Sequence, residues 1–168
     1  MDSTRTPLIE TVNLKKLFKL PGGAHLHAVD GINLKIFSGE TVGVVGESGC
    51  GKSTLGRTIL RLLEPTSGQI LYKGTDITNL KSGKMRELRK DLQIIFQDPY
   101  SSIDPRKSVV EVIAEYMFIH KTYPTKAAIY NRAAELMDLV GLARRCANLY
   151  PHELDGGRRQ RIGIARAL

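Results

Sequence analysis

Apolar and polar positions alternate in short runs along the amino-terminal part of the chain, and the runs are bounded by turn-forming residues. TVNLKKLF (11–18) and INLKIF (32–37) lead into PGG and SGE, and a third run, SGQILYKG (67–74), follows a glycine turn. Alternation of this kind, bounded by glycine and proline, is typical of half-buried strands. We therefore expect a strand in each of these three runs.

Two further runs are almost unbroken in apolar residues. TVGVVG (41–46) and LQIIFQDP (92–99) have the composition of strands buried on both faces, as in a parallel sheet, and Pro99 stops the second. Between them, an apolar stripe at spacings of four and three predicts a helix from about Lys52 to Leu63.

The character of the chain changes after this second run, and about residues 105–150 have helical periodicity. In TKAAIYNRAAELMDLVG, Thr125 is a plausible N-cap and Gly141 a plausible residue just past the helix end. We place a subdomain boundary near DPYSSIDPR. The expected organisation is one domain with three parts, namely an α/β core, a helical subdomain and a final helix over residues 1–98, 99–155 and 156–168.

Composition narrows the class of protein without naming a function. The length of 168 residues suits one compact domain, and no apolar run is long enough to cross a bilayer. The start has no secretory pattern and two cysteines make no disulfide framework, so we expect a cytosolic location. The net charge of +8 permits a nucleic acid, an anionic membrane or a phosphate ligand. We expect most arginines near the end to form a solvated helix face, and the four histidines have no metal-binding spacing.

The stretch GESGCGKST lies between an expected buried strand and an expected helix. It contains Gly46-x-x-x-x-Gly51-Lys52-Ser53, the spacing of a phosphate-binding loop. Glycines let the backbone curl so that several N–H groups point at one anion, and the helix dipole adds positive potential. Lys52 would reach the β- and γ-phosphates and Ser53 would place its hydroxyl on Mg²⁺. The loop predicts a nucleoside triphosphate site, which a kinase, a GTPase or a motor would all contain.

The final stretch, LDGGRRQRIGIARAL, resembles the L-S-G-G-Q-x-Q-R motif of ABC-type ATPases. IIFQDP resembles the Q-loop of that family and includes Gln97, VNLKKLF places Phe18 where the family stacks an aromatic residue on adenine, and YPHELDGG matches the family layout. The stretches QDPYSSIDPR and VGVVGESGCGKST are most similar to ATP-binding subunits of oligopeptide and dipeptide importers. The resemblance covers about residues 8–168.

The resemblance implies an α/β P-loop NTPase core of the ABC ATPase type, with an antiparallel β subdomain and an inserted helical subdomain. It implies ATP and Mg²⁺ as ligands, with Gln97 meeting the Mg²⁺ or orienting a water molecule. It also implies that the helix start at 155–157 binds the γ-phosphate of an ATP held by the opposite subunit. The implied ligand-contacting residues, with Ser53 and Gln97 on the metal, are Phe18, Gly46, Glu47, Ser48, Gly49, Cys50, Gly51, Lys52, Ser53, Thr54, Gln97, Asp155, Gly156 and Gly157.

The sequence departs from the family pattern in two ways. Asp155 and Arg158 replace the usual serine and glutamine, and an ionised aspartate cannot donate a hydrogen bond to phosphate, so we expect weakened pairing of subunits. The chain also stops before the family's Asp-Glu strand (Walker B) and switch histidine, so it is expected to be C-terminally incomplete and hydrolysis-deficient alone. Asp98 is a poor substitute for the metal-binding aspartate of that strand. We further expect TVGVVG to lack strand neighbours and to expose apolar edges.

The expected function is that of the ATP-binding subunit of an oligopeptide or dipeptide importer, coupling ATP binding and hydrolysis to peptide transport. The implied partners are membrane permease subunits and a second ATP-binding subunit, with the peptide handled indirectly and no nucleic acid, at the cytoplasmic face of the cell membrane. Three alternatives stay open: a P-loop kinase or other nucleotide enzyme that uses Asp98, a non-catalytic module that docks on a membrane permease, and a DNA-linked ABC-type ATPase. The positive charge fits the last, but the chain has no long coiled-coil heptads.

Overall fold

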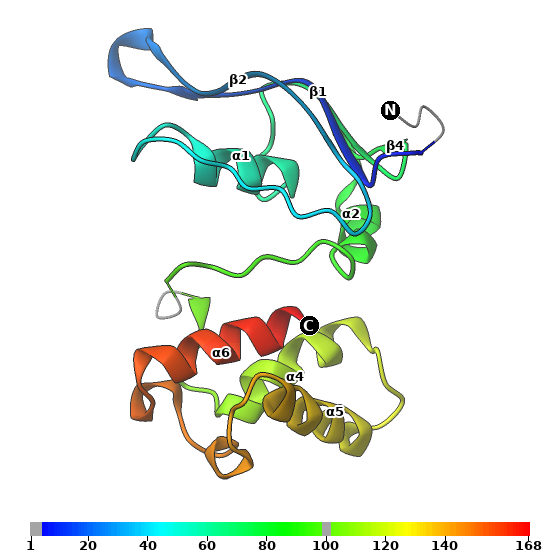
Figure 1. Ribbon diagram of the computed structural model, residues 1–168, viewed down its shortest axis with the longest axis vertical. Helices are drawn as coiled ribbons and strands as arrows, with labels where there is room; N and C mark the ends of the chain where they lie inside the picture. Colours follow the sequence, from blue (N-terminus) through cyan, green and yellow to red (C-terminus); the bar gives the residue numbers. More distant parts are fainter. Residues whose placement is uncertain (1–4, 99–101) are drawn as a thin grey trace. The chain divides into compact units, whose positions relative to one another are not determined.

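The computed structural model describes residues 5–98 and 102–168. The chain divides into two compact units, residues 1–92 and 93–168 (Figure 1). The first unit contains the antiparallel sheet and the phosphate-binding loop, and the second is helical, so each is described by itself. Pro99, which we expected to stop a strand, lies outside the described residues.

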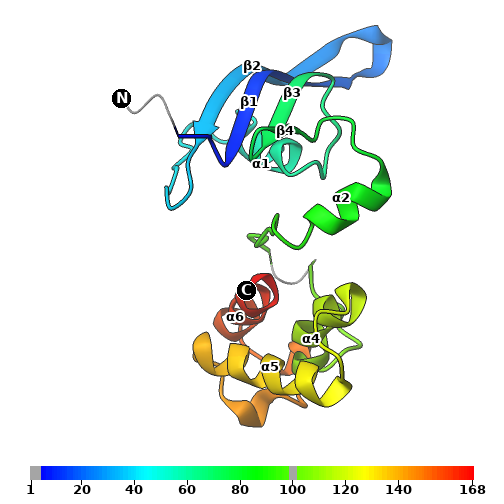
Figure 2. The same ribbon diagram turned by 90° about the vertical axis from the view of Figure 1, so that its right-hand side faces the viewer.

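A four-stranded antiparallel sheet forms the scaffold of the first unit. Its strands are β1 (Ile9–Lys19), β2 (His25–Ile36), β3 (Ser67–Tyr72) and β4 (Thr75–Asp76), in the order β2-β1-β3-β4. Figure 2 shows β1 and β2 as a long hairpin, which turns through a short 3₁₀ segment, η1 (Pro21–Gly23). The three strands expected from alternation are confirmed.

The described residues of this unit also form the helices α1 (Lys52–Ile59) and α2 (Ser82–Leu88). α1 contacts β1 and β2. The core side chains come from the sheet, from the segment after β4, from α2 and from the segment after α2; they are Ile9, Leu14, Val29, Ile70, Tyr72, Ile77, Met85 and Leu92. Leu14, Ile70 and Ile77 are fully buried, and each such side chain contributes about 1.5–3 kcal/mol of hydrophobic stabilisation.

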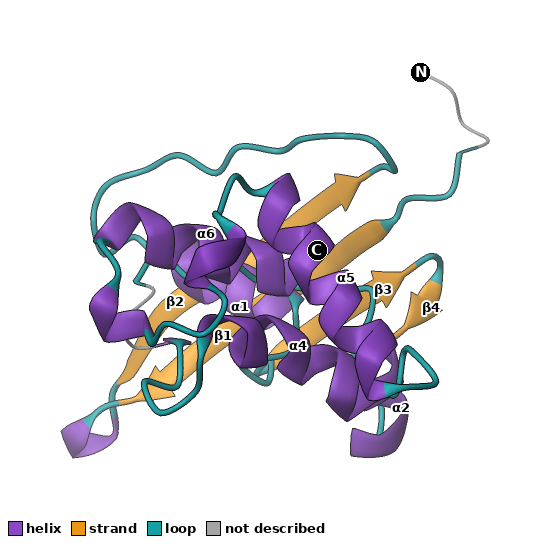
Figure 3. Cartoon of the chain, turned by 90° about the horizontal axis from the view of Figure 1, so that it is seen from below, coloured by secondary structure: helices purple, strands orange, loops and turns teal. Residues whose placement is uncertain are grey.

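The prediction of a buried strand over 41–46 is wrong. Residues 37–51 form a loop, drawn in teal in Figure 3, and Val44 and Val45 are 50% and 96% exposed. A strand needs a neighbour to satisfy its backbone hydrogen bonds, and within the described residues this segment pairs with no strand. The second expected strand is absent for the same reason, since residues 93–98 form no regular element. The expected exposure of the apolar side chains of TVGVVG is confirmed.

The helix expected over Lys52–Leu63 ends earlier, at Ile59. Arg61 has a left-handed backbone with φ 55°, which bends the chain out of the helix. The amides of Leu62 and Leu63 both donate to the carbonyl oxygen of Arg57, at 2.8 and 3.2 Å, so they close a terminal turn instead of continuing α1.

The described part of the second unit contains the helices α4 (Val109–His120), α5 (Lys126–Leu139) and α6 (Gly156–Ala167), with 3₁₀ turns η2 (Arg144–Cys146) and η3 (Pro151–Glu153). The predicted ends of α5 are confirmed. The Thr125 hydroxyl accepts a hydrogen bond from the amide of Ala128 at 3.1 Å, and Gly141 follows the helix with φ 68°. The helices share one apolar core that includes Val112, Ile113, Leu136, Met137 and Ile162.

Neither a membrane span nor a metal cluster is found within residues 5–98 and 102–168. No helix there has both the length and the apolar character that crossing a bilayer requires. No group of three or more histidine, cysteine, aspartate or glutamate side chains in these ranges could hold a metal ion.

Candidate nucleotide-binding site

The glycine-rich loop of the first unit enters α1 through a backbone that only glycine accepts easily. Gly51 is the N-cap of α1 and has φ 96°. A Cβ added there would lie 2.0 Å from the carbonyl oxygen of Ala28, on β2. No side chain caps α1, so the N–H groups of its first turn remain available to an external acceptor. The close approach of β2 and the open helix start together form a cradle of the kind that binds an anion.

Lys52 is folded back into this loop. Its ammonium group donates to the carbonyl oxygens of Gly46 at 2.8 Å and Glu47 at 2.5 Å, and lies 3.7 Å from the sulfur of Cys50. The loop therefore wraps around its own cation, and phosphate oxygens would have to replace these carbonyl contacts. A Cβ added at Gly46 would lie 2.8 Å from the Cys50 sulfur, so the Cys50 side chain would have to turn away from it.

A surface pocket of about 280 Å³ connects the loop to the β1–β2 hairpin. It is lined by Gly49, Cys50, Gly51, Lys52, Ser53 and Thr54 from the loop and α1, and by Phe18, Leu26, His27 and Ala28 from the hairpin. Phe18 pairs with Leu26 across the hairpin, so both residues lie at the pocket. The structure thus brings Phe18 together with six of the expected loop residues. The other three expected loop residues, Gly46, Glu47 and Ser48, do not line the pocket.

The pocket has a positive character. None of its lining residues carries a carboxylate. The neighbouring carboxylate, Asp30, is engaged by Lys15 at 2.9 Å and by the His27 ring at 3.1 Å. These hydrogen bonds, from Lys15 first and then from His27, hold the pKa of Asp30 below its usual value. An anionic ligand is therefore not repelled by a free carboxylate among the lining residues.

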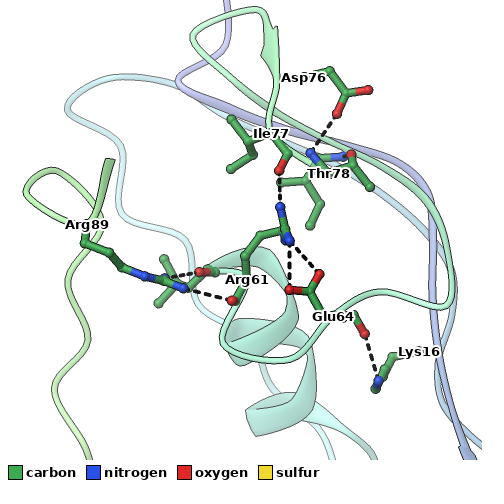
Figure 4. Close-up of polar contacts among 9 residues, drawn as sticks. Lys16, Arg61, Glu64, Asp76, Ile77, Thr78 and Arg89 are labelled. Atoms are coloured by element: carbon green, nitrogen blue, oxygen red, sulfur yellow. Dashed lines mark hydrogen bonds and ion pairs between the residues drawn. The ribbon is translucent and has the colours of Figure 1, made fainter. Parts of the chain in front are cut away.

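The carboxyl end of α1 is fixed by two arginines that sequence reasoning missed (Figure 4). Arg89 donates to the carbonyl oxygens of Leu60 and Arg61, the second at 2.8 Å. Arg61 donates to the carbonyl oxygen of Ile77 at 2.6 Å and to both carboxylate oxygens of Glu64 at 2.6 and 2.7 Å. Burial, followed by the charge of Arg61, lowers the pKa of Arg89. The sequence shows the two arginines but gives no indication that they bind carbonyl oxygens far away along the chain.

Gln97 belongs to the second unit and lies exposed in a bend outside any strand. Its expected position at the end of a buried strand is therefore wrong, because that strand does not form among the described residues. Its role toward Mg²⁺ or water stays a prediction.

The start of α6, also in the second unit, has the geometry expected of a capped helix. Asp155 accepts a hydrogen bond from the amide of Arg158 at 2.8 Å, and the two side chains form an ion pair at 3.3 Å. Arg158 thus offsets the aspartate charge that replaces a neutral serine. Gly156 and Gly157 are exposed, and nothing lies within 4 Å of a Cβ added at Gly156, so the helix start is open.

Most of the arginines near the end of the chain are exposed, as expected, but one arginine of α6 is buried. Arg159 is buried and its Nε donates to the carbonyl oxygen of Pro151 at 2.7 Å. Arg161 donates to the carbonyl oxygens of Val140 and Gly141 at 3.1 and 2.7 Å, at the carboxyl end of α5. These arginines bind backbone carbonyls because helix and turn ends leave carbonyls without a helical partner.

The chain is similar to a known family of proteins. The profile of the ABC transporter family matches residues 29–168. The oligopeptide transport ATP-binding protein OppF of Bacillus subtilis is 51% identical over 162 residues, covering 96% of this chain and 53% of the relative. OppF of Salmonella typhimurium is 43% identical over 172 residues, covering 98% of this chain and 52% of the relative. The chain thus spans about half the length of the curated relatives it matches.

Among solved structures, the dimeric ATP-binding cassette MJ0796 in a post-hydrolysis state, bound to ADP and Pi, has a TM-score of 0.86. It is 30% identical, and the match covers 95% of this chain and 68% of that one. The fold is therefore that of an ABC ATPase cassette, which is of the α/β P-loop NTPase type. Since the family profile also covers most of the sequence, the protein belongs to the ABC transporter family.

Proposed function

We propose that this chain is the nucleotide-binding part of an ATP-binding subunit that serves an oligopeptide or dipeptide importer. The observation that carries the proposal is the pocket that joins Phe18 to the loop 49–54 and to the open start of α1. Such a pocket suits a ligand with an aromatic base at one end and a polyphosphate at the other. The relatives named above are oligopeptide transport ATP-binding proteins, which supports the choice of cargo.

The residues of the pocket fit Mg-ATP. The first-turn amides of α1 and the ammonium group of Lys52 would bind phosphate oxygens, and Phe18 would stack on adenine. The hydroxyl of Ser53, exposed at the same pocket, would hold Mg²⁺. When bound, the metal would neutralise charge on the phosphates. Gln97 is the proposed residue for orienting a water molecule or meeting the metal.

A second subunit completes the proposed assembly. The open start of α6, at Asp155, Gly156 and Gly157, would bind the γ-phosphate of an ATP held by that subunit. MJ0796 is dimeric in its solved structures, which supports pairing. The pair would act on membrane permease subunits from the inner face of the membrane. We also propose that the chain alone turns ATP over slowly, since no carboxylate lines the pocket to serve as a general base.

The test is calorimetric titration of the chain with Mg-ATP, comparing wild type with Lys52→Ala. We expect binding to be weakened at least about ten-fold in Lys52→Ala, since a charge-assisted contact to phosphate contributes about 1.5–3 kcal/mol. Lys19→Ala removes an exposed lysine from β1 outside the pocket lining and is the matched control. Equal affinity of wild type and Lys52→Ala would refute the assignment of the loop.

A further inference from the structure

Lys16 connects the aromatic wall of the pocket to a rigid part of the first unit. Its ammonium group lies over the ring of Phe18, 5.1 Å from the ring centroid. The same ammonium donates to the carbonyl oxygen of Glu64 at 2.7 Å (Figure 4). Phe18 lines the pocket and Lys16 does not. One face of the ring is therefore occupied by a cation, while the ring also borders the pocket.

The acceptor that holds Lys16 is itself fixed. Both oxygens of the Glu64 carboxylate accept hydrogen bonds from Nη2 of Arg61, whose side chain is only 7% exposed. Arg61 is anchored in turn on the carbonyl oxygen of Ile77. The adjoining residue Thr66 fastens the same segment to β1, because its amide donates to the carbonyl oxygen of Lys15 at 2.8 Å and its hydroxyl accepts from the amide of Leu17 at 2.9 Å.

We propose that Lys16 is a positioning residue for base stacking on Phe18, an inference that rests on the proposed function. Phe18 is only half-buried, so its ring has freedom to rotate unless a neighbour holds it. A cation attracted to one face fixes the ring plane and leaves the opposite face for the base. The cation also draws π-electron density toward itself, which lowers the repulsion between the ring and an electron-rich base stacked on the other face.

This role predicts a selective effect. Lys16 would strengthen the binding of a nucleotide through its base and leave the binding of the bare polyphosphate unchanged. A lysine that merely adds positive charge would strengthen both ligands alike. A lysine that merely stabilises the fold would also affect both ligands alike, because both need the folded loop.

The experiment measures dissociation constants for Mg-ATP and for Mg-tripolyphosphate by calorimetry on the full chain. For Lys16→Met we expect ATP to bind about three-fold more weakly, the change typical of one exposed cation–π contact, with no change for tripolyphosphate. Lys16→Arg keeps a cation over the ring and should restore the wild-type ratio. Lys19→Met removes a neighbouring exposed charge and should leave both constants as they are. In a Phe18→Ala background, Lys16→Met should have no further effect on ATP.

Three outcomes would overturn the proposal. The first is that Lys16→Met changes neither constant while ATP binding still depends on Lys52, which leaves the proposed function intact and removes the inference alone. The second is an equal loss for both ligands, which would make Lys16 a general charge or a structural residue. The third is the absence of Lys52-dependent binding in wild type, which would remove the proposed function and the inference together.

Discussion

Gly51→Ala is the substitution by which the shape of the loop can be tested most sharply. The position has φ 96°, where an alanine backbone is strained by about 1–2 kcal/mol. The new Cβ would also lie 2.0 Å from the carbonyl oxygen of Ala28 and 3.2 Å from its carbon, so the backbone of the loop or of β2 must move. Overpacking of this kind costs about 1–3 kcal/mol. We therefore expect Gly51→Ala to lower the free energy of unfolding of the first unit by about 2–5 kcal/mol.

Two other glycines of the same segment provide matched controls. Gly56 lies in the middle of α1, exposed, with nothing within 4 Å of an added Cβ, so Gly56→Ala should raise stability by about 0.5–1 kcal/mol through helix propensity. Gly49 has φ 80° and open space around it, so Gly49→Ala should lose only the strain of about 1–2 kcal/mol. Urea unfolding followed by circular dichroism, with and without Mg-ATP, ranks the three variants and the wild type by their free energy of unfolding. A Gly51→Ala protein as stable as wild type would refute the close approach of β2.

Three further predictions concern other parts of the chain. Arg89→Met should lower the free energy of unfolding by about 1–3 kcal/mol in urea titrations, because the carbonyls of Leu60 and Arg61, just past the end of α1, lose their half-buried donor; an unchanged midpoint would show that water replaces it. Hydrogen bonds from Arg106 lower the pKa of Asp104 to about 2, so the stabilising effect of this carboxylate is complete above pH 4 and is lost as the pH falls through 2. In Arg106→Gln the carboxyl resonance of Asp104 should titrate at a higher pH when followed by NMR, and an unmoved midpoint would contradict the pairing. Asp155→Ala should cost α6 about 1 kcal/mol of unfolding free energy, whereas Asp155→Ser should keep the cap, and equal losses in both would refute its role as N-cap.

Local chemistry was predictable wherever it depends on neighbours in the sequence. The caps of α5 follow from Thr125 and Gly141, and the start of α1 at Lys52 follows from the glycine-rich stretch before it and the apolar stripe after it. Alternation identified the strands of the antiparallel sheet because those strands pair with each other within the same unit.

Features that depend on distant contacts were not predictable. TVGVVG has strand composition, yet it forms a loop because no described strand pairs with it. The early end of α1 depends on the left-handed backbone of Arg61 and its bond to Ile77, sixteen residues away in sequence. The contact of Gly51 with Ala28 depends on how β2 passes the loop, and no residue pattern announces it.

The most direct measurement of the central claim is an amide NMR titration of the chain, first with Mg-tripolyphosphate and then with Mg-ATP. If the loop binds a triphosphate, both ligands should shift the amides of residues 49–54 most strongly, and only ATP should also shift Phe18 and the hairpin residues that line the pocket. The largest shifts falling outside the loop, or an absence of shifts at residues 49–54 at saturating nucleotide, would contradict the account.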